Sequence, residues 1–203
     1  MRRGWLLLIV AVLLAGCGQR GERKSETASS DTTLTPAPHD GSVDSSATSL
    51  DSVLAPPRSA EWTAGIVDLP ALDDSIATLV SVRHAAHGNF DRLVFEWSSA
   101  GRPGAHVEYI DRPVRSCGSG EVVPLAGDAW LLIKFTPAVA HTEEGHPTVG
   151  DRSRTPNLPT LKELELICDF EADVSWVAGV SSPQRYRAFV LTDPPRVIVD
   201  IGH

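Results

Sequence analysis

The segment Tyr186-Arg-Ala-Phe-Val-Leu191 and the segment Arg196-Val-Ile-Val-Asp-Ile201 decide the fold class of this 203-residue chain. Both are rich in β-branched and aromatic residues, and both are short enough to be single strands. Between them stands Thr192-Asp-Pro-Pro195, and consecutive prolines favour a turn. The end of the chain therefore predicts two strands joined by a turn.

Similar short runs recur upstream of this pair. Alternating or buried-strand patterns cover residues 77–83, 90–97, 106–110, 129–135 and 161–168. No segment shows a capped apolar repeat of 3.6 residues, so no helix is expected. Short, mainly antiparallel strands separated by Gly and Pro turns indicate an all-β sandwich or barrel. It would form one domain over residues 61–203, with Trp62, Trp97, Trp130 and Trp176 expected mostly in its core.

The start of the chain has the features of an export signal. Two arginines precede the apolar run from Trp5 to Leu14, which is too short for the ~20 residues that span a bilayer. The sequence Leu14-Ala-Gly-Cys17 that follows resembles the lipobox of bacterial lipoproteins. The resemblance implies removal of a signal peptide, residues 1–16, and attachment of lipid, including palmitate, to Cys17. An ordinary secretory signal with an incidental cysteine is the alternative.

These features predict an exported protein that is attached to a membrane through the lipid on Cys17. The residue after Cys17 is Gly18, whereas an Asp at this position would resemble an inner-membrane retention signal. We therefore expect the anchor at the outer membrane or the cell surface. Residues 18–60 contain no aromatic residue and are rich in Ser, Thr, Asp and Pro. Residues 17–60 are therefore predicted to be a lipidated, disordered tether with a span of ~35–40 Å.

Charge and cysteine content narrow the function further. The formal net charge is −8 and the chain has only three lysines, so a nucleic-acid partner is not expected. With Cys17 assigned to lipid, Cys117 and Cys168 are the two cysteines of an exported domain, which favours a disulfide between them. A reactive or metal-binding role for either cysteine is the alternative.

Two segments carry a family resemblance. The first is an alternating strand with an arginine near its start, Phe90-Asp-Arg-Leu-Val-Phe-Glu-Trp97. The second lies at the end of the chain and reads Leu191-Thr-Asp-Pro-Pro-Arg-Val-Ile-Val-Asp200. Together with Arg112-Pro-Val-Arg-Ser-Cys-Gly-Ser-Gly120 and Cys168, they resemble the AMIN-like domain of bacterial lipoproteins, related to the AMIN domain of cell-wall amidases and secretins. The resemblance covers residues 77–201 and implies a β-sandwich that binds or localises to peptidoglycan.

Six residues are candidate binding residues. Arg196 and Asp200 are four apart on a predicted strand and so share a face, where they either pair with a neighbouring strand or contact glycan. The others lie between Thr136 and Thr160, a stretch predicted to be a long loop without strands: His141, Glu143, His146 and Arg152. Loops of this length are often functional, although an inert solvated excursion is the alternative.

The sequence predicts no catalytic residue, no metal and no cofactor. Gly145 and Pro147 argue against a helix that could present His141 and His146 to zinc. We therefore expect a non-enzymatic, membrane-anchored envelope lipoprotein whose domain binds or localises to peptidoglycan. A module that binds an envelope protein instead of glycan is the first alternative. A metal-dependent hydrolase centred on His141 and His146 is the second.

Overall fold

The computed structural model describes residues 60–98 and 101–203. Eleven strands occur in these two ranges, and no helix does. Their bounds are β1 Val67–Leu69, β2 Ala77–His87, β3 Phe90–Trp97, β4 Gly104–Ile110, β5 Ala129–Thr136, β6 Ala138–Val139, β7 Ser153–Arg154, β8 Leu161–Phe170, β9 Asp173–Val180, β10 Tyr186–Thr192 and β11 Pro195–Gly202. Because these residues form no helix, they contain none that could cross a membrane.

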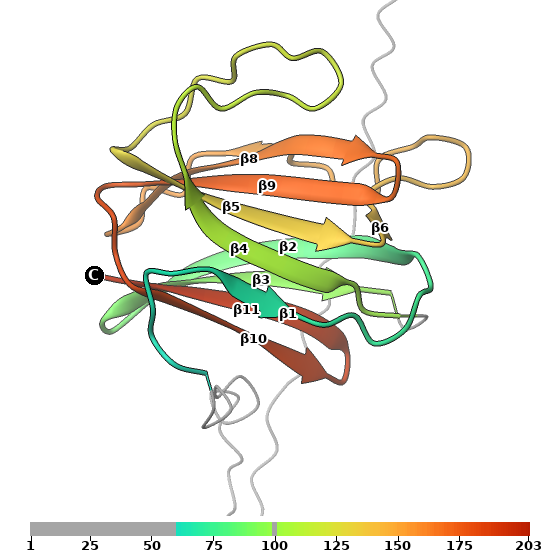
Figure 1. Ribbon diagram of the computed structural model, residues 1–203, viewed down its shortest axis with the longest axis horizontal. Coiled ribbons are helices and arrows are strands. Elements are labelled where there is room, and N and C mark those ends of the chain that lie inside the picture. The colour runs from blue at the N-terminus through green and yellow to red at the C-terminus, as the bar shows by residue number, and fades with distance from the viewer. Residues whose placement is uncertain (1–59, 99–100) are drawn as a thin grey trace, which may run out of the picture. The chain divides into compact units, whose positions relative to one another are not determined.

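The strands form two sheets that pack face to face (Figure 1). The larger sheet has the order β1-β4-β5-β9-β8-β7, and the smaller one has the order β10-β11-β3-β2-β6. Every pairing is antiparallel except that of β2 with β6. The predicted all-β sandwich of mainly antiparallel strands is therefore confirmed.

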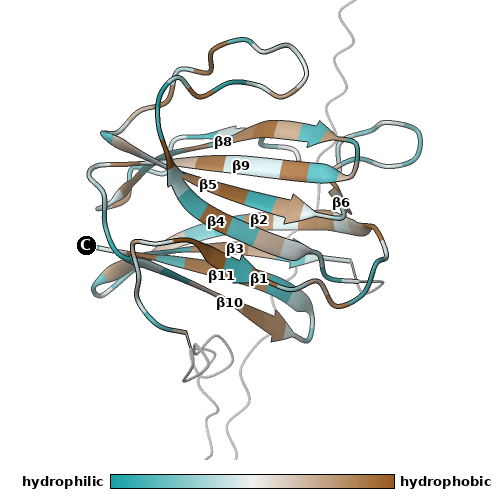
Figure 2. Ribbon diagram, viewed as in Figure 1, coloured by the Kyte–Doolittle hydropathy of each residue, from teal (hydrophilic) through white to brown (hydrophobic). Residues whose placement is uncertain are grey.

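The core between the sheets is apolar and rich in aromatic rings. Phe95 and Trp97 of β3 contact Phe135 of β5, with ring centroids 4.8 Å apart in each case. Trp176 of β9 is fully buried, and its ring centroid lies 6.1 Å from that of Phe95. Figure 2 shows that the strands carry polar residues as well as apolar ones, as expected when one face of each sheet meets the core.

The seven strands predicted from sequence are β2, β3, β4, β5, β8, β10 and β11. The turn predicted at Pro194-Pro195 also forms, since Thr192 pairs with Pro195 across the β10–β11 hairpin. Trp97 and Trp176 lie in the core as expected, whereas Trp62 and Trp130 are only half-buried.

The expectation that residues 136–160 lack strands was wrong. Ala138–Val139 pairs with β2, and Ser153–Arg154 pairs with β8. The fully buried Ala140 and the nearly buried Val149 belong to the main core. Small apolar residues among many polar ones were enough to fasten this segment to the edges of both sheets.

The predicted signal peptide (1–16), the lipidation site Cys17 and the tether as far as residue 59 lie outside the described residues. These assignments stay predictions. Ala60, the first described residue, packs against the apolar cluster of Val94, Phe189 and Ile198 on the smaller sheet.

Candidate functional site

Asp200 and Arg196 lie on β11, which stands between β10 and β3 in the smaller sheet. The Asp200 side chain has no exposed surface and accepts two hydrogen bonds from Arg92 of β3, at 2.6 and 2.8 Å. Arg187 of β10 donates a third, at 2.9 Å. The pairing of Asp200 with charges on neighbouring strands is therefore present, and it occupies both oxygens of this carboxylate.

Arg196 makes local contacts instead. Its guanidinium donates to the carbonyl oxygens of Asp193 and Pro194, at 3.0 and 3.1 Å, and so closes the β10–β11 hairpin. The side chain is almost completely buried. Direct contact of Arg196 or Asp200 with a glycan stays a prediction.

Aromatic rings cover the two arginines that hold Asp200. The guanidinium carbon of Arg187 lies 4.6 Å from the ring centroid of Trp62, and that of Arg92 lies 5.1 Å from the centroid of Phe90. Such stacking stabilises a cation while excluding water from it. Asp200, Arg92 and Arg187 therefore form a largely buried network that stabilises the fold.

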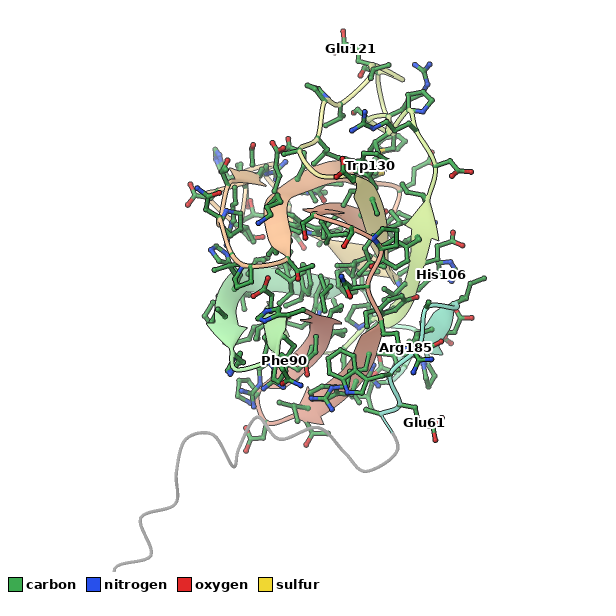
Figure 3. The ribbon with its side chains drawn as sticks, turned by 90° about the vertical axis from the view of Figure 1, so that its left-hand side faces the viewer. Glu61, Phe90, His106, Glu121, Trp130 and Arg185 are labelled. Carbon is green, nitrogen blue, oxygen red and sulfur yellow. A yellow bond between two sulfur atoms is a disulfide. The ribbon has the colours of Figure 1, made fainter. Side chains whose placement is uncertain are left out.

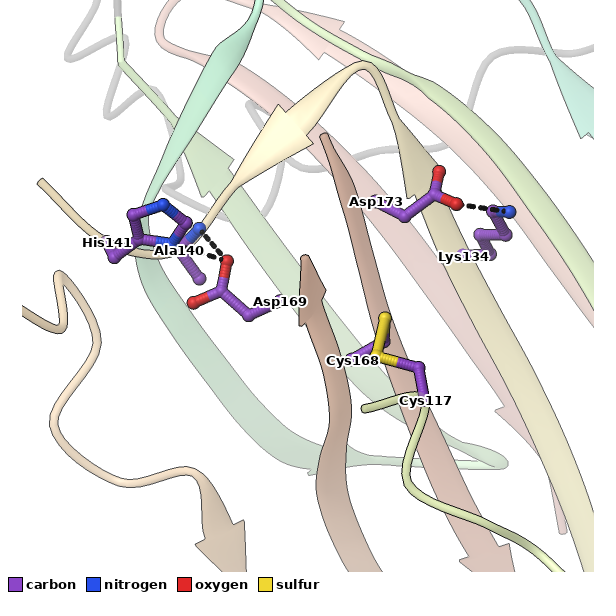
Figure 4. The surroundings of a disulfide bond; sticks show 7 residues. All are labelled: Cys117, Lys134, Ala140, His141, Cys168, Asp169 and Asp173. Carbon is purple, nitrogen blue, oxygen red and sulfur yellow. Dashed lines mark hydrogen bonds and ion pairs between the residues drawn. A yellow bond between two sulfur atoms is a disulfide. The ribbon is translucent and has the colours of Figure 1, made fainter. Parts of the chain in front are cut away.

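The candidate residues of the 136–160 segment divide into two groups. His141 and Arg152 both contact Asp169 of β8, through His141 Nδ1 at 2.8 Å and Arg152 Nη2 at 3.0 Å. The Ala140 amide donates to the same carboxylate at 2.8 Å (Figure 4). Glu143 and His146 are exposed nearby. The first group fastens the segment to β8, and a binding role for all four residues stays a prediction.

No metal centre forms around these histidines in the part of the chain that the structure describes. Among those residues, no three His, Cys, Asp or Glu side chains converge as metal ligands. The Nδ1 atom of His141 faces Asp169 rather than an open position.

The predicted disulfide between Cys117 and Cys168 is present, with Cα atoms 5.2 Å apart (Figure 4). It joins the long β4–β5 connection, residues 111–128, to β8. The Cys117 amide strengthens this junction by donating to the Ile167 carbonyl at 3.0 Å. Both sulfurs are used in the bond, so a free reactive or metal-binding thiol at either position does not fit the structure.

Two of the open hollows on the described residues are candidate ligand sites. The first, the His141 hollow, has a volume of about 490 Å³ and is lined by Ile76, Thr78, Val139, His141, Thr142, Glu143 and Thr148. The second, the Trp130 hollow, has a volume of about 520 Å³. It lies at one end of the sandwich and is lined chiefly by Tyr109, Asp111, Asp128, Trp130, Gln184 and Arg185. Figure 3 looks onto the side that carries Trp130 and Arg185.

Burial changes the acidity of one group in the Trp130 hollow. The pKa of Tyr109 is raised above its usual value because its phenol is partly desolvated, although its bond with the Gln184 backbone opposes this. The phenol therefore stays protonated at neutral pH and can only act as a neutral hydrogen-bonding group.

Comparison with known families places this fold. The family model for the AMIN-like domain matches residues 77–203, which include β2 to β11. The chain belongs to the AMIN-like domain family. Searches of curated proteins and of solved structures each found no match.

Membership of the AMIN-like family indicates a cell-envelope protein, and such domains are typically binding modules rather than enzymes. The matched segment contains all six main lining residues of the Trp130 hollow, from Tyr109 to Arg185. All of them therefore belong to the AMIN-like domain itself. Ala64, a further lining residue, precedes the matched segment.

Sequence reasoning did not find the Trp130 hollow. Asp111 and Asp128 stand at the two ends of the β4–β5 connection, and Arg185 lies far along the chain in the β9–β10 connection. Only the pairing of β4 with β5, and the return of the chain through β9 and β10, bring them together. The available signal was Trp130 at the start of an apolar strand, which the sequence analysis assigned to the core.

Proposed function

We propose that the protein is a lipid-anchored envelope protein whose AMIN-like domain binds peptidoglycan. The observation that carries the proposal is the family match over residues 77–203, which takes in nearly the whole sandwich. Support for the anchor comes from the apolar run and Leu14-Ala-Gly-Cys17 at the start of the chain.

In this proposal the anchor and the domain act together. The lipid on Cys17 keeps the chain at a membrane, and residues 18–60 supply reach toward the wall. Tethering turns the encounter with the wall into an intramolecular event at raised effective concentration. A weak contact between the domain and glycan is then sufficient for stable occupancy.

The anchor is tested by metabolic labelling with radioactive palmitate. The full chain should incorporate label and sediment with membranes, because Cys17 carries the acyl groups. The Cys17→Ser variant should incorporate none. Equal labelling of both chains would overturn the assignment of Cys17.

Wall binding is tested by sedimentation of residues 18–203 with two preparations of peptidoglycan sacculi. One preparation keeps its attached proteins, and the other is protease-treated. Sedimentation with both supports peptidoglycan as the ligand. Sedimentation with the protein-bearing sacculi alone supports the rival, a module that binds an envelope protein, and overturns the glycan proposal.

A further inference from the structure

The Trp130 hollow combines an aromatic lining with planar polar groups. Trp130 of β5 and Tyr109 of β4 supply the aromatic surface, and both are half-buried. The exposed side chains of Asp111, Asp128 and Arg185 stand at its margin. Its volume of about 520 Å³ lies within the range of about 300–1,000 Å³ that is usual for ligand pockets.

The walls of this hollow are tied together across the sandwich. The Tyr109 hydroxyl donates to the Gln184 carbonyl at 2.8 Å and accepts from the Gln184 amide at 2.9 Å. Tyr109 belongs to the larger sheet, and Gln184 lies in the connection from that sheet to the smaller one. This reciprocal pair fixes the distance between two sides of the hollow.

The side formed by residues 126–130 is fixed as well. The Asp128 amide donates to the Val180 carbonyl at 2.8 Å, and the Ala126 amide donates to Glu163 Oε2 at 2.6 Å. The Arg112 guanidinium carbon lies 3.9 Å from the centroid of the Trp130 ring and holds that ring in place. A preorganised site loses little conformational entropy when a ligand binds.

The chemistry of the lining selects for a sugar. A pyranose offers C–H groups that pack on aromatic surface, and its hydroxyl and amide N–H groups donate to carboxylates such as Asp111 and Asp128. Arg185 and the Gln184 side chain can donate to ring, hydroxyl or acetyl oxygens. Residues 60–203 hold twelve Lys and Arg against twenty Asp and Glu, a balance that disfavours phosphate-rich polyanions.

We propose that the Trp130 hollow binds pyranose units of an envelope glycan. The proposal rests on the function proposed above and names the surface through which the AMIN-like domain would engage it. The His141 hollow is the weaker candidate because no Phe, Tyr or Trp lines it and His141 already contacts Asp169. Peptidoglycan strands and the oligosaccharide of lipopolysaccharide are two sources of the same sugar chemistry.

The test is a two-dimensional NMR titration of ¹⁵N-labelled residues 18–203. One arm uses peptidoglycan glycan strands freed of their stem peptides, and the other uses a lipopolysaccharide core oligosaccharide. With the first ligand, the Trp130 indole and the Gln184 and Arg185 amides should shift most. The second ligand should cause no comparable change.

Three variants probe the hollow. Trp130→Ala should weaken binding at least tenfold, and Asp128→Asn and Arg185→Gln should each weaken it severalfold. The Asp128 and Arg185 side chains are exposed, so replacing them should not affect folding. These two variants can therefore test the hollow even if Trp130→Ala fails to fold. Trp62→Ala and Asp74→Asn, a tryptophan and a carboxylate outside the hollow, are the matched controls and should bind as the parent does.

The outcomes separate this inference from the proposed function. Sedimentation with sacculi together with unchanged affinity in all three variants overturns the hollow and leaves peptidoglycan binding intact. Sedimentation without any NMR shift from free strands has the same meaning. Shifts from the lipopolysaccharide oligosaccharide alone support the hollow as a sugar site and contradict peptidoglycan as its source. Loss of both sedimentation and shifts overturns both proposals.

Discussion

The carboxylate of Asp200 and the arginines beside it show what the charged residues of the smaller sheet do. Asp200 is fully buried, and the Arg92 side chain is only 5% exposed. Charges at this depth are tolerated because three hydrogen bonds join Asp200 to Arg92 and Arg187. Removing one partner would leave the other buried without compensation.

Asp200→Ala should therefore lower the free energy of unfolding by about 3–5 kcal/mol, since it leaves two arginines without their carboxylate. Urea unfolding followed by circular dichroism measures this loss. The matched control is Asp173→Ala, which removes the partly exposed ion pair between Asp173 and Lys134. Exposed pairs contribute roughly 0–1 kcal/mol, so equal effects of the two variants would contradict the structural role of Asp200.

His106 is a second residue whose charge affects stability. Its pKa is raised above the usual value, mainly by the hydrogen bond to Asp68 of β1 and less by the bond to Glu108, while burial opposes the shift. A raised folded-state pKa means that the stabilisation is complete below the ordinary value of about 6.5. It is lost as pH rises through the folded-state pKa.

The pairing of β1 with β4 should accordingly weaken on the alkaline side. In an NMR titration, Asp68→Asn should return the His106 pKa toward its ordinary value. The stability difference between the parent and this variant should be larger at pH 5.5 than at pH 9. A difference that does not vary with pH would show that Asp68 does not act through the charge of His106.

At the scale of elements, alternating or continuous apolar runs predicted seven strands, among them β3 and β11, in which six of eight residues are buried. β9 was missed because seven of its eight residues are buried, which removes alternation, while Ser175, Ala178 and Gly179 interrupt the apolar run. Trp176 and Val180 face the main core, and Val177 contacts Val114 and Leu125 of the 111–128 connection on the other side. A strand covered on both faces loses the alternation that marks a strand in the sequence.

Some parts of the candidate sites could be predicted from the sequence and others could not, because the sequence pattern shows local structure but not which strands become neighbours. The cysteine pair could be predicted because the expected export signal and the cysteine count restrict the choice. Sequence reasoning also placed Arg196 and Asp200 on one face, since strand period alone determines that. It did not find the Trp130 hollow, because the partners come from connections whose approach depends on strand order.

The contact of β9 with residues 126–128 makes a prediction at this scale. A Cβ on Gly179 would overlap the carbonyl oxygen of Ala126. Gly179→Ala should therefore lower the free energy of unfolding by about 1–3 kcal/mol and shift the Asp128 and Trp130 resonances. Gly88→Ala is the control, because a Cβ there meets no atom within 4 Å. Unchanged Asp128 and Trp130 resonances in Gly179→Ala would contradict the close packing.

The disulfide makes another prediction about an element. It closes a loop between positions 51 residues apart, for which the chain-entropy model gives about 4 kcal/mol of stabilisation. Replacing Cys117 and Cys168 together by Ala should lower stability by up to this amount and broaden the NMR signals of residues 111–128. If those signals keep their positions and widths, the connection is held by its apolar contacts instead.

At the scale of the whole molecule, an AMIN-like domain and an expected anchor lie on one chain. The described sandwich has its own aromatic core, a β4–β5 connection joined to β8 by a disulfide, and a hollow with fixed walls. The sequence before it has the composition expected of a spacer behind a lipid. The account therefore depends most on whether this domain recognises the wall directly.

A binding isotherm of residues 18–203 on protein-free sacculi tests that claim most directly, measured before and after digestion of the sacculi with a muramidase. The account predicts saturable sedimentation with intact sacculi and its loss once the glycan strands are cut into soluble fragments. Protein that stays in the supernatant at every concentration of intact sacculi would contradict the account.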